Sequence, residues 1–122
     1  MNLLLMLTAV IEAATGLALM AMPAVVVRLL LGGELGGAGI PLGRVAGFAL
    51  LSLGVACWPS SEPAGNTGPA LRAMLTYNVL ATLFFLYLGI GEWAGPLLWP
   101  VAALHAVLSL LLARQWRLGN RG

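Results

Sequence analysis

Residues 2–22 read NLLLMLTAVIEAATGLALMAM, a long apolar run that carries a single ionisable side chain, Glu12. A helix of ~20 mostly apolar residues is long enough to cross the hydrocarbon core of a bilayer. Three further stretches, roughly 40–58, 70–91 and 95–113, have the same character. The sequence therefore predicts four membrane-spanning helices. Because no Lys or Arg precedes the first run, we expect a retained helix and not a cleaved signal peptide.

The composition also indicates a membrane protein. Of the 122 residues, 61% are hydrophobic and only 8% are charged, and the mean hydropathy is +0.98, which lies outside the usage of soluble domains of this size. A net charge of +2 is too small and too scattered for a surface that binds nucleic acid. The one cysteine, Cys57, excludes an internal disulfide and a cysteine-cluster metal site.

The segments between the spans are short, so we expect the whole chain to form one four-span domain. Ala24–Gly32 follows Pro23 and is too short to span; it either lies along the membrane interface or extends the first helix past a proline kink. Gly32–Gly39 reads as a flexible loop, Pro59–Pro69 as a polar turn, and Gly91–Pro96 as a tight connection into the last span.

The arginines predict the orientation, since cytoplasmic loops of membrane proteins are enriched in Lys and Arg. Four lie at the end that holds both termini: Arg72, Arg114, Arg117 and Arg121. The other end has Arg28 and Arg44. We therefore expect both termini in the cytoplasm. The tryptophans fit an even number of spans, because Trp58 and Trp116 fall at the first end and Trp93 and Trp99 at the second.

Each predicted span carries polar residues that helical spacing gathers on one face. The first has Thr8, Glu12 and Thr15, with Gly16 beside them; the third has Asn78 and Thr82; the fourth has His105 and Ser109. The second has Arg44 and a stripe of small residues, Gly43, Gly47 and Gly54, which allows another helix to approach closely.

A rise of 1.5 Å per residue places Glu12, Asn78 and His105 near mid-depth, with Arg44 nearer the non-cytoplasmic surface. An unpaired charge at the bilayer centre costs at least ~2.5–3.5 kcal/mol. We therefore expect Glu12 to turn inward toward Arg44, His105 or Asn78, or to be uncharged. The four residues together form the predicted polar core of an all-α, antiparallel four-helix bundle.

The polar core allows two interpretations. It either fixes only the register of the helices, or it binds a polar headgroup, a quinone-like or other lipophilic ligand, or a proton. No catalytic residues and no metal site are predicted, because His105 lacks a His or Cys partner and neither Cys57 nor Ser109 has a base beside it. The aromatic cluster of Tyr77, Phe84, Phe85 and Tyr87 is read as lipid-facing or packing.

The stretches IEAATGLALMAMP, VVVRLLLG and GAGIPLGRVAGFALLSLGVACW resemble the first half of small, largely uncharacterised bacterial four-helix membrane proteins. The whole chain is more loosely similar to DoxX-like proteins in size and number of spans. Glu12, Pro23, Arg44 and the glycine spacing carry the resemblance. It implies a four-helix bundle in a bacterial inner membrane, and it keeps open a role beside a quinone-linked oxidoreductase.

The favoured function is that of a non-enzymatic membrane protein. It acts as a subunit or accessory factor of a membrane partner, or it binds a lipophilic ligand such as a lipid or quinone at the polar core. No residue pattern identifies a cofactor. The alternative is a small transporter or channel, working as a homo-oligomer packed through the glycine stripe and coupled to protons at Glu12.

Overall fold

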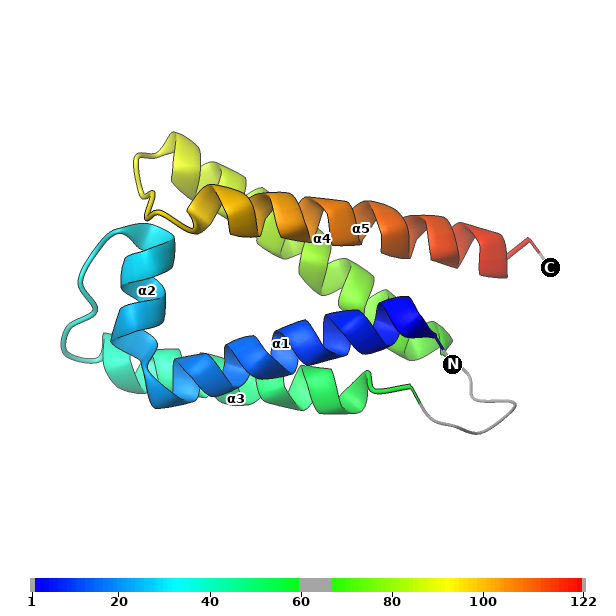
Figure 1. The fold of residues 1–122 in the computed structure, drawn as a ribbon, viewed down its shortest axis with the longest axis horizontal. Coiled ribbons are helices and arrows are strands. Elements are labelled where there is room, and N and C mark those ends of the chain that lie inside the picture. Colours follow the sequence, from blue (N-terminus) through cyan, green and yellow to red (C-terminus); the bar gives the residue numbers. More distant parts are fainter. Residues whose placement is uncertain (1, 60–66, 122) are drawn as a thin grey trace.

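The computed structural model describes residues 2–59 and 67–121, and all regular structure in these ranges is helical. Four long helices form an antiparallel bundle, and a short helix follows the first of them (Figure 1). In chain order the helices are α1 (Leu3–Ala21), α2 (Pro23–Leu31), α3 (Gly39–Ala56), α4 (Gly68–Ile90) and α5 (Leu98–Gly119). The long helices are each long and apolar enough to cross a membrane. The predicted fold class is therefore confirmed.

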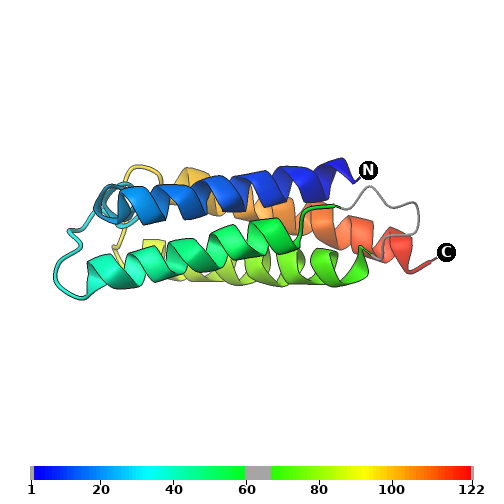
Figure 2. The ribbon, with the colours of Figure 1, turned by 90° about the horizontal axis from the view of Figure 1, so that it is seen from below.

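Both chain ends lie at one end of the bundle, and α2 lies at the other (Figures 1 and 2). The turn predicted at Pro59–Pro69 includes residues 60–66, which lie outside the described residues. At the end that holds α2, the loop Gly32–Ala38 joins α2 to α3, and Gly91–Leu97 joins α4 to α5. The even number of spans inferred from the tryptophans agrees with this arrangement.

The helices α1 and α3 pack closely because glycines bring their backbones together. A Cβ atom added at Gly47 would lie 2.6 Å from the carbonyl oxygen of Gly16, and one added at Gly54 would lie 2.7 Å from that of Ala9. Neither space admits a side chain without a shift of the backbone. At the end of the same interface, a Cβ atom at Gly43 would lie 3.0 Å from Cβ of Pro23. The glycine stripe of α3 thus packs within this chain.

Helix α2 does not continue α1. Met22 has φ −139° and ψ 62°, which interrupts the helix, and α2 then runs across the end of the bundle (Figure 1). At its C-terminus, the carbonyl groups of Leu29 and Leu30 accept hydrogen bonds from the N–H groups of Leu97 (2.8 Å) and Gly95 (2.9 Å). These bonds satisfy carbonyls that a helix end would otherwise leave unpaired. The segment before α5 therefore holds α2 in place.

Candidate functional site

Four polar side chains are buried among the apolar residues of the bundle: Thr8, Glu12, Asn78 and His105. They come from α1, α4 and α5, and each is at most 5% exposed. Apolar side chains such as Leu5, Met74 and Leu112 are buried in the same bundle. Because water is excluded from such a site, every polar atom in it needs a partner within the protein or in a ligand.

A hydrogen bond between His105 and Asn78 links α5 to α4. Nδ1 of His105 lies 2.8 Å from Oδ1 of Asn78, and the side-chain nitrogen Nδ2 of Asn78 donates to the carbonyl oxygen of Met74 at 2.9 Å. Two aromatic rings pack on the imidazole, Tyr77 edge-on at 5.8 Å and Phe85 at 5.6 Å between ring centroids. The imidazole is therefore fixed in position from α4.

Glu12 is 1% exposed, and its partner is Tyr77, whose hydroxyl group hydrogen-bonds with the carboxyl group. The carboxyl group of Glu12 is only partly hydrogen-bonded, because Oε1 has no hydrogen-bond partner among the described residues. Glu12 thus points inward, as its cost in hydrocarbon requires. It does so beside a phenol and not beside a cation.

Arg44 is exposed and does not lie in this core, so it is not the partner of Glu12 among the alternatives that the sequence allowed. Arg44 is exposed, and the one ion pair within the described ranges joins Arg28 to Glu34 at 3.6 Å. The reason is the register of α1 on α3. Gly47 lies against Gly16, so Arg44, almost one turn closer to the α2 end, is well removed in depth from Glu12.

The hydroxyl groups predicted to line the core are engaged with their own helices. Each donates to a backbone carbonyl three or four residues earlier: Thr8 to Leu5 at 2.9 Å, Thr15 to Ile11 at 2.8 Å, Thr82 to Asn78 at 2.8 Å and Ser109 to His105 at 2.7 Å. Such bonds let hydroxyl groups sit in hydrocarbon without an external partner. The donor protons of these four groups are therefore occupied.

A cavity of about 370 Å³ lies beside the polar core, between α1, α2, α4 and α5, and it opens at the surface of the bundle, where Leu29, Leu97 and Leu104 are 38–42% exposed. Its polar lining residues are Thr15 and His105, and the rest of the lining is apolar. The apolar lining residues are Ile11, Ala14, Ala18, Val26, Leu29, Leu30, Phe85, Leu97, Val101 and Leu104. Glu12 and Asn78 do not line it. The predicted core therefore divides into a closed polar cluster and a cavity, and His105 belongs to both.

The predicted aromatic cluster on α4 also divides. Phe84 and Tyr87 are 57% and 72% exposed and stack on each other, with ring centroids 6.5 Å apart, on the face that would meet lipid. Tyr77 and Phe85 instead turn inward to His105. Tyr77 is the site residue that sequence reasoning missed. A phenol at mid-depth in a span needs a partner for its hydroxyl group, and that need is the signal that could have identified it.

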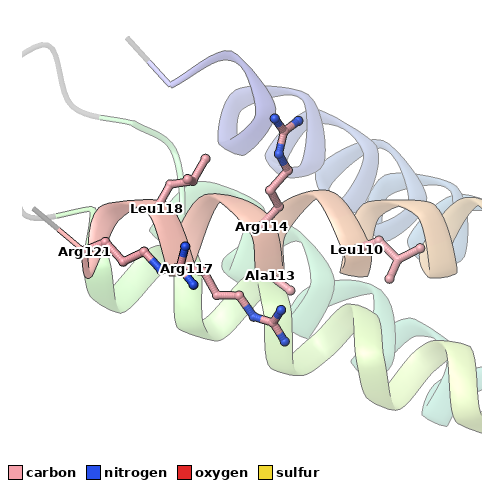
Figure 3. A pocket seen from close by; sticks show the side chains of 6 residues that line it. All are labelled: Leu110, Ala113, Arg114, Arg117, Leu118 and Arg121. Atoms are coloured by element: carbon pink, nitrogen blue, oxygen red, sulfur yellow. The ribbon is translucent and has the colours of Figure 1, made fainter.

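Three exposed arginines surround a shallow pocket of about 280 Å³ on the outer part of α5 (Figure 3): Arg114, Arg117 and Arg121. Leu110, Ala113 and Leu118 complete its lining. The guanidinium groups of Arg114 and Arg117 point to different sides of the helix (Figure 3). The three side chains thus spread over a surface and do not converge on one anion. This arrangement suits anchoring at the membrane surface.

Over residues 2–59 and 67–121, no three His, Cys, Asp or Glu side chains gather in a way that could hold a metal ion. Comparison with known proteins gave no matching family model, no matching curated protein and no matching solved structure. The resemblance to DoxX-like proteins and the bacterial origin that it implies therefore gain no support. The polar cluster and the cavity beside it are thus the features from which a function can be inferred.

Proposed function

We propose that this multi-pass membrane protein is a non-enzymatic binder of a lipophilic ligand, which occupies the cavity between α1, α2, α4 and α5. The observation that carries the proposal is the cavity itself, about 370 Å³ in volume and apolar except at Thr15 and His105. Small-molecule sites are mostly apolar clefts of roughly 300–1,000 Å³ with a few fixed polar groups. A lipid chain or a lipid-soluble ring with one polar substituent matches this description.

His105 is the group that would orient the ligand. Its imidazole is held by Asn78 at one edge and packed against Phe85, so it is already in place before a ligand arrives. Preorganisation of this kind reduces the entropic cost of binding.

The alternative, a transporter or channel that assembles through the glycine stripe, has lost its main motivation. Gly47 and Gly54 face the backbone of α1 in the same chain, so they are not available to pack a second copy. Binding of a ligand by one chain needs no such assembly. A role as subunit or accessory factor of a larger membrane complex is compatible with ligand binding and stays part of the proposal.

We propose that the protein lies in the cell inner membrane of a bacterium, as the resemblance of its first half implies, with both termini in the cytoplasm. The support for this orientation is the charge at the two ends. The end with the termini carries four arginines, whereas the other end carries two, Arg28 and Arg44. Excess positive charge on one side favours the cytoplasm.

The proposal can be tested by identifying the lipophilic molecules that copurify with the protein. Ala18→Phe would fill part of the cavity, since Ala18 is one of its lining residues. Ala103→Phe is the matched control, because Ala103 is exposed on α5 and does not line the cavity. We expect the wild type and the Ala103→Phe variant to carry a bound lipophile in a defined ratio, and the Ala18→Phe variant to lose it. Equal loads in all three would reject the proposal.

A further inference from the structure

We infer that the cavity binds lipophiles that can donate a hydrogen bond more tightly than matched lipophiles that can only accept one. The first class includes long-chain alcohols, phenols and quinols, and the second includes ethers, ketones and quinones. This inference rests on the proposed ligand-binding function and specifies the chemistry of the ligand's polar group. The observation behind it is the pair of hydrogen bonds made by the Asn78 side chain next to the cavity.

The two partners of the Asn78 amide fix its orientation. Its nitrogen Nδ2 lies 2.9 Å from the carbonyl oxygen of Met74, and two acceptors cannot hydrogen-bond to each other, so the donor end of the amide must face Met74. Oδ1 is then the atom that faces His105, at 2.8 Å from Nδ1. A carbonyl oxygen can only accept. Nδ1 of His105 must therefore carry the proton of this hydrogen bond.

The other ring nitrogen of His105 is consequently an acceptor. An uncharged imidazole has one N–H group and one lone pair, so a proton on Nδ1 leaves the lone pair on Nε2. No carboxylate within the described ranges forms an ion pair with His105, and its neighbours are the rings of Tyr77 and Phe85. In these surroundings the uncharged ring is the form that the interior of a membrane protein favours.

The Nε2 edge of the ring is the one left for a ligand. His105 is 5% exposed and lines the cavity, and its Nδ1 edge is occupied by Asn78. The other polar lining group, the hydroxyl of Thr15, already donates to the carbonyl oxygen of Ile11 at 2.8 Å, so it too has only lone pairs to offer.

Both polar groups of the cavity thus present acceptors, and the chain supplies no free donor from them. A ligand with a hydroxyl group can donate to Nε2 of His105. A ligand with only an ether or carbonyl oxygen would bring two lone pairs together and leave its own polar atom unpaired, which is costly in a dry site. Sites built around such a bond discriminate strongly against analogues that cannot make it.

The inference can be tested with dodecanol and dodecyl methyl ether, which differ in the donor proton of the hydroxyl group. Radiolabelled dodecanol is bound to the detergent-purified protein and displaced by each unlabelled compound, with empty micelles as the reference for partitioning. We expect the alcohol to compete at least about tenfold more strongly than the ether. His105→Phe should abolish this preference while leaving a weaker, unselective binding to the apolar walls.

Asn78→Leu is the informative second variant, because it leaves the imidazole in place but removes the acceptor that fixes its proton. The preference for the alcohol should shrink there and stay unchanged in Ser109→Ala, whose hydroxyl group bonds within α5. Equal competition by alcohol and ether in the wild type would overturn the inference and leave the proposed function standing. Absence of any saturable binding would overturn the proposed function. The wild-type comparison decides even if a variant fails to fold.

Discussion

Nδ1 of His105 lies 2.8 Å from Oδ1 of Asn78, and this contact between two buried side chains joins α5 to α4. Among the described residues neither side chain has a charged partner, so a neutral hydrogen bond and the rings of Tyr77 and Phe85 hold the imidazole. In water such a bond would exchange with solvent, whereas in a dry interior losing one partner leaves the other unsatisfied. The same contact both stabilises the helix pair and defines what the cavity can bind.

Asn78→Leu is expected to lower the free energy of unfolding by about 1–3 kcal/mol, because it orphans the N–H group of His105. Combined with His105→Phe, it should cost less than the sum of the single changes. The measurement is a double-mutant cycle of reversible unfolding in mixed micelles. Thr82→Val is the control on α4, since its hydroxyl group bonds to its own helix. Strictly additive losses would show that Asn78 and His105 do not interact.

Glu12→Ala should couple to Tyr77→Phe and not to Arg44→Leu. Tyr77 is the partner of the Glu12 carboxyl group, whereas Arg44 is exposed. In a second cycle of unfolding free energies, the pair with Tyr77 should deviate from additivity by about 0.5–3 kcal/mol. The pair with Arg44 should be additive within about 0.5 kcal/mol. A large coupling between Glu12 and Arg44 would contradict the register of α1 on α3.

The four spans can be predicted from hydropathy because the bilayer imposes a length of apolar sequence on each one. Their ends cannot. Hydropathy predicts the last span over 95–113, whereas α5 is Leu98–Gly119. Hydropathy indicates only where the apolar sequence ends. The helix itself continues beyond Arg114 into the polar region, because its backbone hydrogen bonds continue there. The start differs because Gly95 and Leu97 bond to α2, a tertiary contact that no local pattern contains.

The inward positions of Glu12, Asn78 and His105 can be predicted from the cost of polar groups in lipid. Their partners cannot. Opposite charge makes Arg44 a candidate partner for Glu12. The glycine contacts, however, fix the register of α3 on α1, and in this register the two residues lie at different depths. Tyr77 is close in sequence to the other aromatic residues of α4. The position of each residue around the helix axis nevertheless decides which of them face inward. Partner choice thus depends on helix register, which a single sequence does not specify.

Gly47→Ala should destabilise the contact between α1 and α3. The added Cβ atom would lie 2.6 Å from the carbonyl oxygen of Gly16 and 2.9 Å from the backbone nitrogen of Met20, so the backbones would have to separate. Overpacking of this kind costs about 1–3 kcal/mol. Gly36→Ala is the matched control, because nothing lies within 4 Å of its new atom. Similar unfolding midpoints for both variants would refute a close helix contact.

Gly95→Val should loosen α2 and reduce the amount of bound lipophile, with only a small change in the unfolding midpoint of the bundle. A side chain at Gly95 would collide with the carbonyl oxygens of Leu29 and Arg28, at the point where the N–H of Gly95 bonds to Leu30. Since Leu29 and Leu30 line the cavity, its wall would move. The checks are the amount of copurified lipophile and the unfolding midpoint, compared with Gly33→Ala, which meets only the Trp93 ring at 3.7 Å. Unchanged ligand content in Gly95→Val would contradict the role of α2 as a wall.

Photolabelling is the decisive measurement, because it shows where on the protein a lipophile binds. A long-chain alcohol with a photoreactive diazirine on its tail is added to the reconstituted protein, irradiated, and located by peptide mass spectrometry, with and without excess dodecanol. We predict labelling that dodecanol displaces and that falls on cavity residues such as Val26, Leu30 and Val101. Labelling spread over outward-facing residues such as Leu42, Leu83 and Leu110, with none displaced at the cavity, would contradict binding of a lipophile between the helices.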